Sequence, residues 1–87
     1  MNSEKSALSA PEVYVLVEGK KPTAVIIGRD QALNHLAQDF RLTFKEQRML
    51  DQARESFRVG QELRLVGYEV GLGGRVEDRV LTRVRSL

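Results

Sequence analysis

Two runs of β-branched residues near the start of the chain limit what it can fold into. Residues 13–17 read VYVLV, residues 23–27 read TAVII, and EGKKP lies between them. β-branched and aromatic residues favour extended strands, and Gly and Pro between two such runs favour a turn. We therefore expect a β-hairpin over residues 13–27.

The middle of the chain has the periodicity of two helices. Asp30 precedes the first apolar stripe, where its carboxylate suits an N-cap, and Thr43 and Glu46 have the spacing of a capping box. These patterns predict helices over residues 30–40 and 44–58. The apolar positions are Ala32, Leu33, Leu36, Ala37 and Phe40 in the first segment and Leu50, Ala53 and Phe57 in the second.

The C-terminal third alternates with period 2, which is typical of strands. Residues 62–70 alternate loosely and residues 75–85 more regularly. In the second segment Val76, Val80 and Val84 share one face. The other face holds Glu77, Arg79, Arg83 and Arg85, with Leu81 as the exception. We therefore expect a half-buried strand whose valines face the core and whose arginines face solvent.

These elements together predict a small ββααββ domain of the α+β class. We expect an antiparallel four-stranded sheet with two helices packed on one face, formed by residues 12–87 and preceded by a flexible tail over residues 1–11. Two strand orders remain open. The strands could pair sequentially, or the two hairpins could lie side by side through their outer strands, which would move the arginine strand from the edge to the centre.

The glycines of residues 71–74, GLGG, raise the question of a phosphate-binding loop. A dinucleotide fingerprint needs G-x-G-x-x-G between a strand and a helix. Here the third glycine is at the wrong spacing, and residues 76–80 continue as a strand. We interpret these glycines as a hairpin turn, where φ above zero is needed.

Two short segments resemble motifs of known families. Residues 15–20, VLVEGK, resemble the first motif of the Toprim fold of topoisomerases and primases, which implies a catalytic role for Glu18. That family also needs an Asp-x-Asp pair, which this sequence lacks, so we interpret Gly19 as a turn. Residues 42–50, LTFKEQRML, are similar to a helix start in LuxR-type DNA-binding domains, although strands, not helices, are expected to follow.

The ionisable residues form no catalytic constellation that we recognise. There are no cysteines, so a thiolate nucleophile and a cysteine-based zinc site are excluded. His35 is the only histidine and has only Asp39 at i+4. Glu77 and Asp78 are adjacent in a strand and so point to opposite faces. We therefore predict a protein that is not an enzyme and has no cofactor, metal or small-molecule substrate.

The same composition bears on location. Small secreted domains usually contain disulfides, so a chain without cysteine favours the cytoplasm. Residues 1–10 contain an acidic residue, Glu4, and no apolar core, and no segment approaches the ~20 apolar residues of a membrane span. We expect a soluble cytoplasmic protein.

The arginines of the C-terminal half suggest an anionic partner. Residues 41–87 hold 10 basic and 7 acidic side chains, a net charge of +3, and nine of the ten are arginine. Arginine suits bidentate contact with phosphate. The candidate nucleic-acid-binding residues are Arg64, Tyr68, Arg75, Arg79, Arg83 and Arg85. The alternative is a solvated outer face partly paired with glutamates, which also protects an edge strand from aggregation.

The first two strands are apolar on both faces, and two short helices can cover only one face of a sheet. Either the N-terminal tail covers the other face or a second subunit does. We favour a second subunit, which would bind through Val13, Val15, Val17, Val25 and Ile27. The function predicted from the sequence is a small non-enzymatic protein-interaction or regulatory module that forms a homodimer. The alternative is a nucleic-acid-binding protein that uses the arginine-rich C-terminal hairpin.

Overall fold

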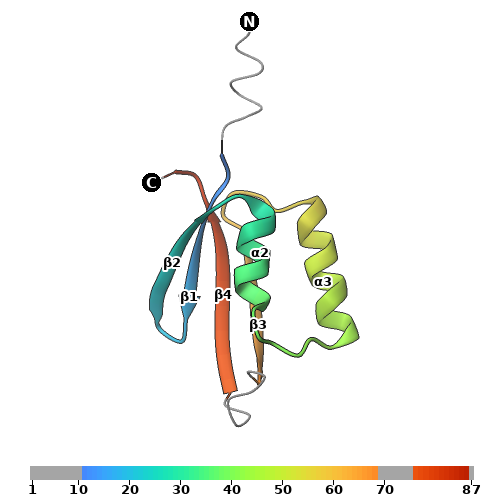
Figure 1. Ribbon diagram of the computed structural model, residues 1–87. Coiled ribbons are helices and arrows are strands. Elements are labelled where there is room, and N and C mark those ends of the chain that lie inside the picture. Colours follow the sequence, from blue (N-terminus) through green and yellow to red (C-terminus); the bar gives the residue numbers. More distant parts are fainter. Residues whose placement is uncertain (1–10, 69–75, 87) are drawn as a thin grey trace, which may run out of the picture.

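A computed structural model describes residues 11–68 and 76–86. It confirms the small α+β fold with the element order ββααββ (Figure 1). The elements are β1 (Val13–Glu18), β2 (Lys21–Ile27), α2 (Arg29–Ala37), α3 (Phe44–Glu55), β3 (Glu62–Tyr68) and β4 (Val76–Val84).

The sheet is antiparallel throughout and has the order β2-β1-β4-β3. The two hairpins therefore meet through β1 and β4, and the second of the two strand orders is correct. In this register Leu16 lies opposite Leu81, and Glu18 lies opposite Arg79. The arginine-bearing strand is central, with neighbours on both sides.

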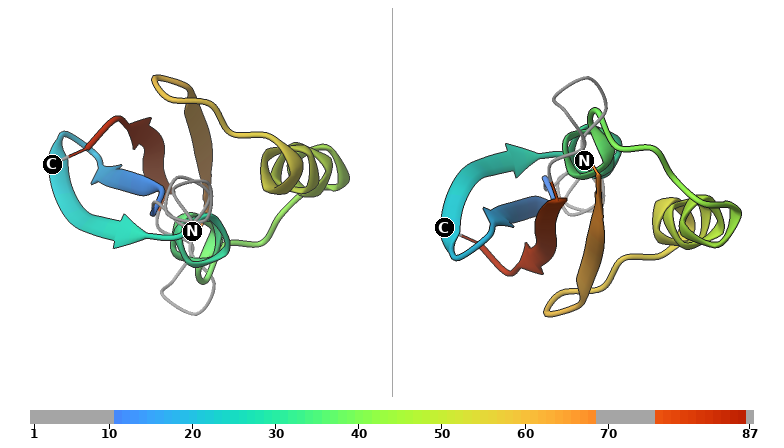
Figure 2. Two further views of the ribbon diagram at one scale, coloured as in Figure 1. Left: turned by 90° about the horizontal axis from the view of Figure 1, so that it is seen from above. Right: turned by 90° about the horizontal axis from the view of Figure 1, so that it is seen from below.

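Both helices lie on one face of the sheet, as predicted (Figure 2). α2 lies over the sheet and runs roughly along its strands, while α3 lies beside α2 and extends past the β3 edge. Within residues 11–68 and 76–86, the second face carries no helix. Neither α2 nor α3 is long and apolar enough to cross a membrane.

The helix starts follow two different capping arrangements. Thr43 and Glu46 form the predicted capping box: the Glu46 amide donates to Thr43 Oγ1 at 3.1 Å, and the Thr43 amide donates to Glu46 Oε1 at 2.8 Å. α2, by contrast, begins at Arg29 with Gly28 as N-cap, so the prediction of Asp30 as the cap is wrong. Gly28 has a φ of 98°, which a residue without Cβ adopts without strain.

Both helices end before the predicted boundary. α2 ends at Ala37 and α3 at Glu55, so Phe40 and Phe57 pack from the segments that follow. The core lies between the helices and the inner face of the sheet. Its buried residues are Tyr14, Leu16, Ile26, Ala32, Leu33, Leu36, Leu50, Ala53, Phe57, Leu63, Leu65 and Leu81.

The glycine-rich segment falls outside the described residues, so its turn cannot be traced. The strands on either side of it bear on the question: residues 76–84 form a strand, as predicted, and this strand is the antiparallel partner of β3. A dinucleotide fingerprint would instead lead into a helix.

Candidate interaction surface

The face of the sheet opposite the helices is apolar, and we call it the outer face. Because side chains alternate along a strand, the inward positions of Tyr14 and Leu16 direct Val13, Val15 and Val17 outward. The register extends this face across β2 and β4. The apolar outer-face residues of these three strands are Val13, Val15, Val17, Val25, Ile27, Val80 and Val84.

All five residues of the predicted dimer face lie on the outer face. Val15 pairs with Val25 on β2, and Val13 pairs with Ile27. Val25 is 52% exposed and Ile27 is 53% exposed, so the β2 side of this face meets solvent in the isolated chain. Val80 and Val84 extend the outer face onto β4. The alternation in the sequence had predicted instead that these two valines face the core.

The charged residues of the outer face lie toward its β3 side. Arg64 and Asp78 form a bidentate ion pair there, with Nε–Oδ1 and Nη2–Oδ2 distances of 2.9 Å. The Arg64 guanidinium holds the pKa of Asp78 below its ordinary value. The pair is solvent-exposed, so it adds little to stability. These two charges pair with each other, Glu62 is exposed on the same side of β3, and the valines of β1 and β2 form the uncharged part of the face.

Arg79 does not face solvent, which corrects the sequence prediction. Its side chain lies on the helix-facing side of β4 and is only 6% exposed. Nε lies 2.9 Å from Oε2 of Glu18, and Nη1 donates to the carbonyls of Leu36 at 3.2 Å and Gln38 at 2.6 Å. The guanidinium also lies over the Phe40 ring, 4.2 Å from its centroid. Arg79 therefore caps the C-terminal end of α2, where carbonyls lack helical partners.

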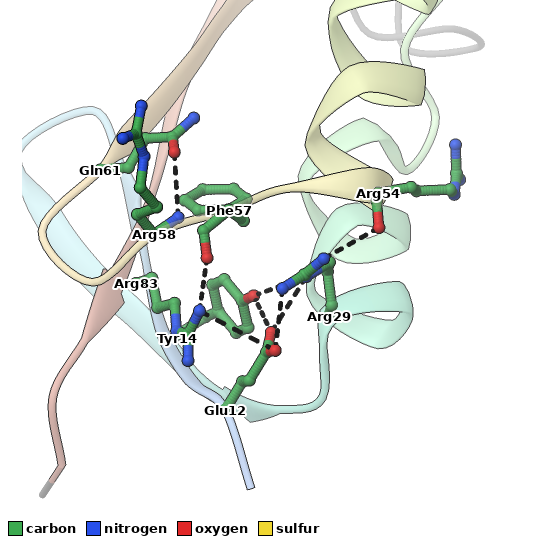
Figure 3. Close-up of polar contacts among 8 residues, drawn as sticks. All are labelled: Glu12, Tyr14, Arg29, Arg54, Phe57, Arg58, Gln61 and Arg83. Atoms are coloured by element: carbon green, nitrogen blue, oxygen red, sulfur yellow. Dashed lines mark hydrogen bonds and ion pairs between the residues drawn. The ribbon is translucent and has the colours of Figure 1, made fainter. Parts of the chain in front are cut away.

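Arg83 is held in a second inward-facing cluster (Figure 3). Its Nη1 donates to the Phe57 carbonyl at 2.5 Å and lies 3.8 Å from Oε2 of Glu12. Arg29 holds the same carboxylate bidentately, with donor–acceptor distances of 3.0 and 2.9 Å, and its Nη1 donates to the Arg54 carbonyl. Two arginines thus tie Glu12 to the C-terminal end of α3.

The six candidate nucleic-acid-binding residues do not form one exposed row. Arg79 and Arg83 face the helices, whereas Arg64 lies on the outer face, paired with Asp78. Arg85 is exposed beyond the end of β4. Arg75 and the Tyr68 side chain lie outside what the structure describes. The predicted exposed ladder is wrong because Leu81, with the same strand parity as both arginines, is fully buried.

The contribution of this polar cluster to stability depends on pH through the carboxyl group of Glu12. Partial burial alone would raise the pKa of Glu12, but hydrogen bonds from Tyr14 and Arg29 outweigh it and hold the pKa below 4.5. A carboxyl with a lowered folded-state pKa stabilises the fold above its unfolded-state pKa. This stabilisation is lost as the pH falls through the folded-state pKa.

We therefore expect Glu12→Gln to lower the free energy of unfolding at pH 7 by about 1 kcal/mol, because charge-assisted hydrogen bonds become neutral ones. The difference from the wild type should shrink as the pH falls through the lowered folded-state pKa of Glu12, where the wild-type carboxyl also becomes protonated. Urea unfolding across this pH range measures both values. Glu62→Gln, at an exposed strand position, is the control, and an equal loss in both variants would contradict the prediction.

The described residues hold no group of three or more His, Asp or Glu side chains that could bind a metal ion. His35 is exposed on α2, with Nδ1 2.9 Å from the Gln31 carbonyl. Glu18, singled out by the Toprim-like segment, faces Arg79 as its ion-pair partner. In this position it stabilises the sheet–helix contact.

Comparison with protein-family models, curated proteins and solved structures found no match for this chain.

Proposed function

We propose that this chain is a non-enzymatic protein-interaction module that forms a homodimer through its outer face. The observation that carries the proposal is the β2 side of the outer face, where Val25 and Ile27 are about half exposed, while Val13 of β1 is buried at 8%. Burial of apolar surface drives most protein association. Two sheets pack face to face at a separation of about 10 Å, with side chains interdigitating.

A second copy is the occupant that this face fits best. A two-fold dimer places the same patch on both partners, so an uncharged face needs no charge complementarity to meet itself. The net charge of +2 gives only weak repulsion between copies. Four strands about 4.8 Å apart and roughly 20 Å long give about 400 Å² of flat area on each partner. This lies toward the small end of specific interfaces, so we expect a dimer of micromolar affinity.

The inward-facing charges support an interaction role over a chemical one. Arg79 and Arg83 are bonded to backbone carbonyls and lie near Glu18 and Glu12, respectively. These contacts join helix ends to the sheet, so the two arginine side chains stabilise the fold. The described valines of the outer face make no comparable contact with a helix end.

Substitution of Val25 by glutamate tests the proposal. A charge at this position would be desolvated in the dimer, so we expect the dissociation constant to rise at least about 100-fold. Sedimentation equilibrium over a concentration series should show the wild type approaching twice the 9.8 kDa monomer mass, and the variant remaining a monomer.

Val59→Glu is the matched control, because Val59 is 46% exposed but lies in the loop between α3 and β3, not on a strand of the outer face. It should dimerise like the wild type. A wild-type chain that stays monomeric at several hundred micromolar would overturn the proposal. Equal weakening in both glutamate variants would do the same.

A further inference from the structure

A shallow groove of about 290 Å³ runs between α3 and the start of β3. Its apolar lining comes from Met49 and Ala53 of α3 and from Leu63 of β3, and polar side chains line the rest. Small-molecule sites are typically larger, at roughly 300–1,000 Å³. The size and open shape suit one or two side chains of an extended segment. The polar lining residues are Gln52, Ser56, Arg58 and Gln61.

The sheet ends at β3, but the helical layer does not. Within the described residues β3 pairs only with β4, and α3 extends past the β3 edge (Figure 2). A fifth strand added beside β3 would therefore lie beneath α3. Its inward side chains would point into the groove.

The backbone of β3 can accept such a strand. The Arg83 amide donates to the Gln61 carbonyl at 3.1 Å, so residue 61 directs its carbonyl toward β4. Hydrogen-bonding direction alternates along an antiparallel strand. Glu62, Arg64 and Val66 therefore direct their N–H and C=O groups to the free edge.

We propose that the β3 edge and the α3 groove bind an extended peptide by strand addition, with an apolar side chain seated against Met49, Ala53 and Leu63 and an acidic side chain paired with Arg58. Backbone hydrogen bonds supply affinity in this mode, and pockets for alternate side chains supply specificity. Arg58 is the only charged residue among the described lining of the groove, and this favours an acidic partner.

A second copy of this chain fits the edge poorly. If two β3 strands paired edge to edge, they would lie about 4.8 Å apart, with both α3 helices on the same face. Each α3 extends past its own β3, and helices are about 10 Å wide, so the two α3 helices would overlap sterically above the paired edges. A single peptide strand meets no such obstacle. The site is separate from the outer face and does not depend on dimerisation.

The nonapeptide Glu-Thr-Val-Thr-Leu-Thr-Val-Thr-Glu tests the proposal. Its sequence reads the same from both ends, so it presents the same side chains whether it pairs parallel or antiparallel to β3. Its alternate residues present leucine at the centre and a glutamate at each end. Fluorescence anisotropy of the labelled peptide should show saturable micromolar binding to the wild type and unchanged binding to Val25→Glu. This result would hold even if the outer face does not dimerise. Absence of saturable binding to the folded wild type overturns the proposal.

Two changes to the peptide separate strand addition from other contacts. N-methylation of alternate backbone amides keeps the side chains but removes the ladder, and over three bonds we expect affinity to fall roughly 30-fold. Lysine at both ends should weaken binding to the wild type and restore binding to Arg58→Glu, which should itself bind the acidic peptide about 10-fold more weakly. If N-methylation of neither set of alternate amides weakens binding, or if the charge exchange fails, the proposal is wrong.

A substitution in the protein tests the same ladder. Val66→Pro removes an N–H group at the free edge of β3 without removing a hydrogen bond to β4, and proline is tolerated at such positions of edge strands. It should abolish peptide binding, whereas Val66→Thr, which keeps the N–H, should bind like the wild type. If Val66→Pro instead reduces self-association and leaves peptide affinity unchanged, the edge binds a second copy. The peptide proposal is then overturned.

Discussion

Replacement of Arg79 by alanine is expected to lower the free energy of unfolding by about 3 kcal/mol, because it removes a buried guanidinium and leaves its hydrogen-bonding and ion-pair partners without a donor. Arg79 is 6% exposed and pairs with Glu18. The substitution also removes the hydrogen bonds to the C-terminal carbonyls of α2 and the contact with the Phe40 ring. Small domains are stabilised by only about 5–15 kcal/mol, so the variant should be close to unfolding at 37 °C.

Urea denaturation followed by circular dichroism measures this loss. Arg85→Ala is the control, because Arg85 is exposed beyond the end of β4, and it should change stability by less than about 0.5 kcal/mol. Combining Arg79→Ala with Glu18→Gln should recover part of the loss, since the unpaired carboxylate is then removed. If Arg79→Ala and Arg85→Ala have equal effects, the capping role of Arg79 is wrong.

This expectation also changes how charge reversal on β4 should be interpreted. Loss of nucleic-acid binding in an Arg79→Glu variant would follow from unfolding alone. Arg64 and Arg85 are the exposed arginines of the candidate set within the described residues, so they are the informative positions for that question.

The element order was predictable because each signal was local. Strand propensity, the turn at Gly19 and the capping box at Thr43 depend on a few neighbouring residues, and all three appear in the structure. Which face of β4 is buried was not predictable by counting valines. That face is decided by the neighbours of the strand, since Glu18 lies opposite Arg79 and Leu16 lies opposite Leu81.

A signal for the correct face was nonetheless present in the sequence. Glu12 and Glu18 share the strand parity of Tyr14 and Leu16, so the inner face of β1 has an acidic residue at each end. A central β4 then needs basic residues on both sides of Leu81, which Arg79 and Arg83 supply. The outer-face residues of β1 and β2 were predictable, because an apolar strand must direct half of its side chains away from one helical layer. The groove was not, because it depends on where α3 lies relative to the β3 edge.

Replacement of Phe57 by alanine is the second large effect that we expect, at about 3–5 kcal/mol, because a buried ring leaves a cavity when it is removed. Phe57 is 1% exposed, and its ring meets the edge of Tyr14 at a centroid distance of 5.1 Å and an angle of 80°. It follows α3 directly and holds that end of the helix near the sheet, where its carbonyl also accepts from Arg83.

The loss of local stability in Phe57→Ala should therefore differ between the elements of the chain. Hydrogen exchange should accelerate more in α3 than in α2, which keeps its own core contacts through Leu33 and Leu36. Phe44→Ala is the matched control, because Phe44 begins α3 and is 79% exposed, and it should change stability by less than about 0.5 kcal/mol. If the two alanine variants lose equal stability, or if α2 and α3 exchange equally fast in Phe57→Ala, then Phe57 does not anchor α3. With α3 loosened the groove loses one wall, whereas the outer face lies on the side of the sheet opposite the helices, so in Phe57→Ala peptide binding should fail before dimerisation does.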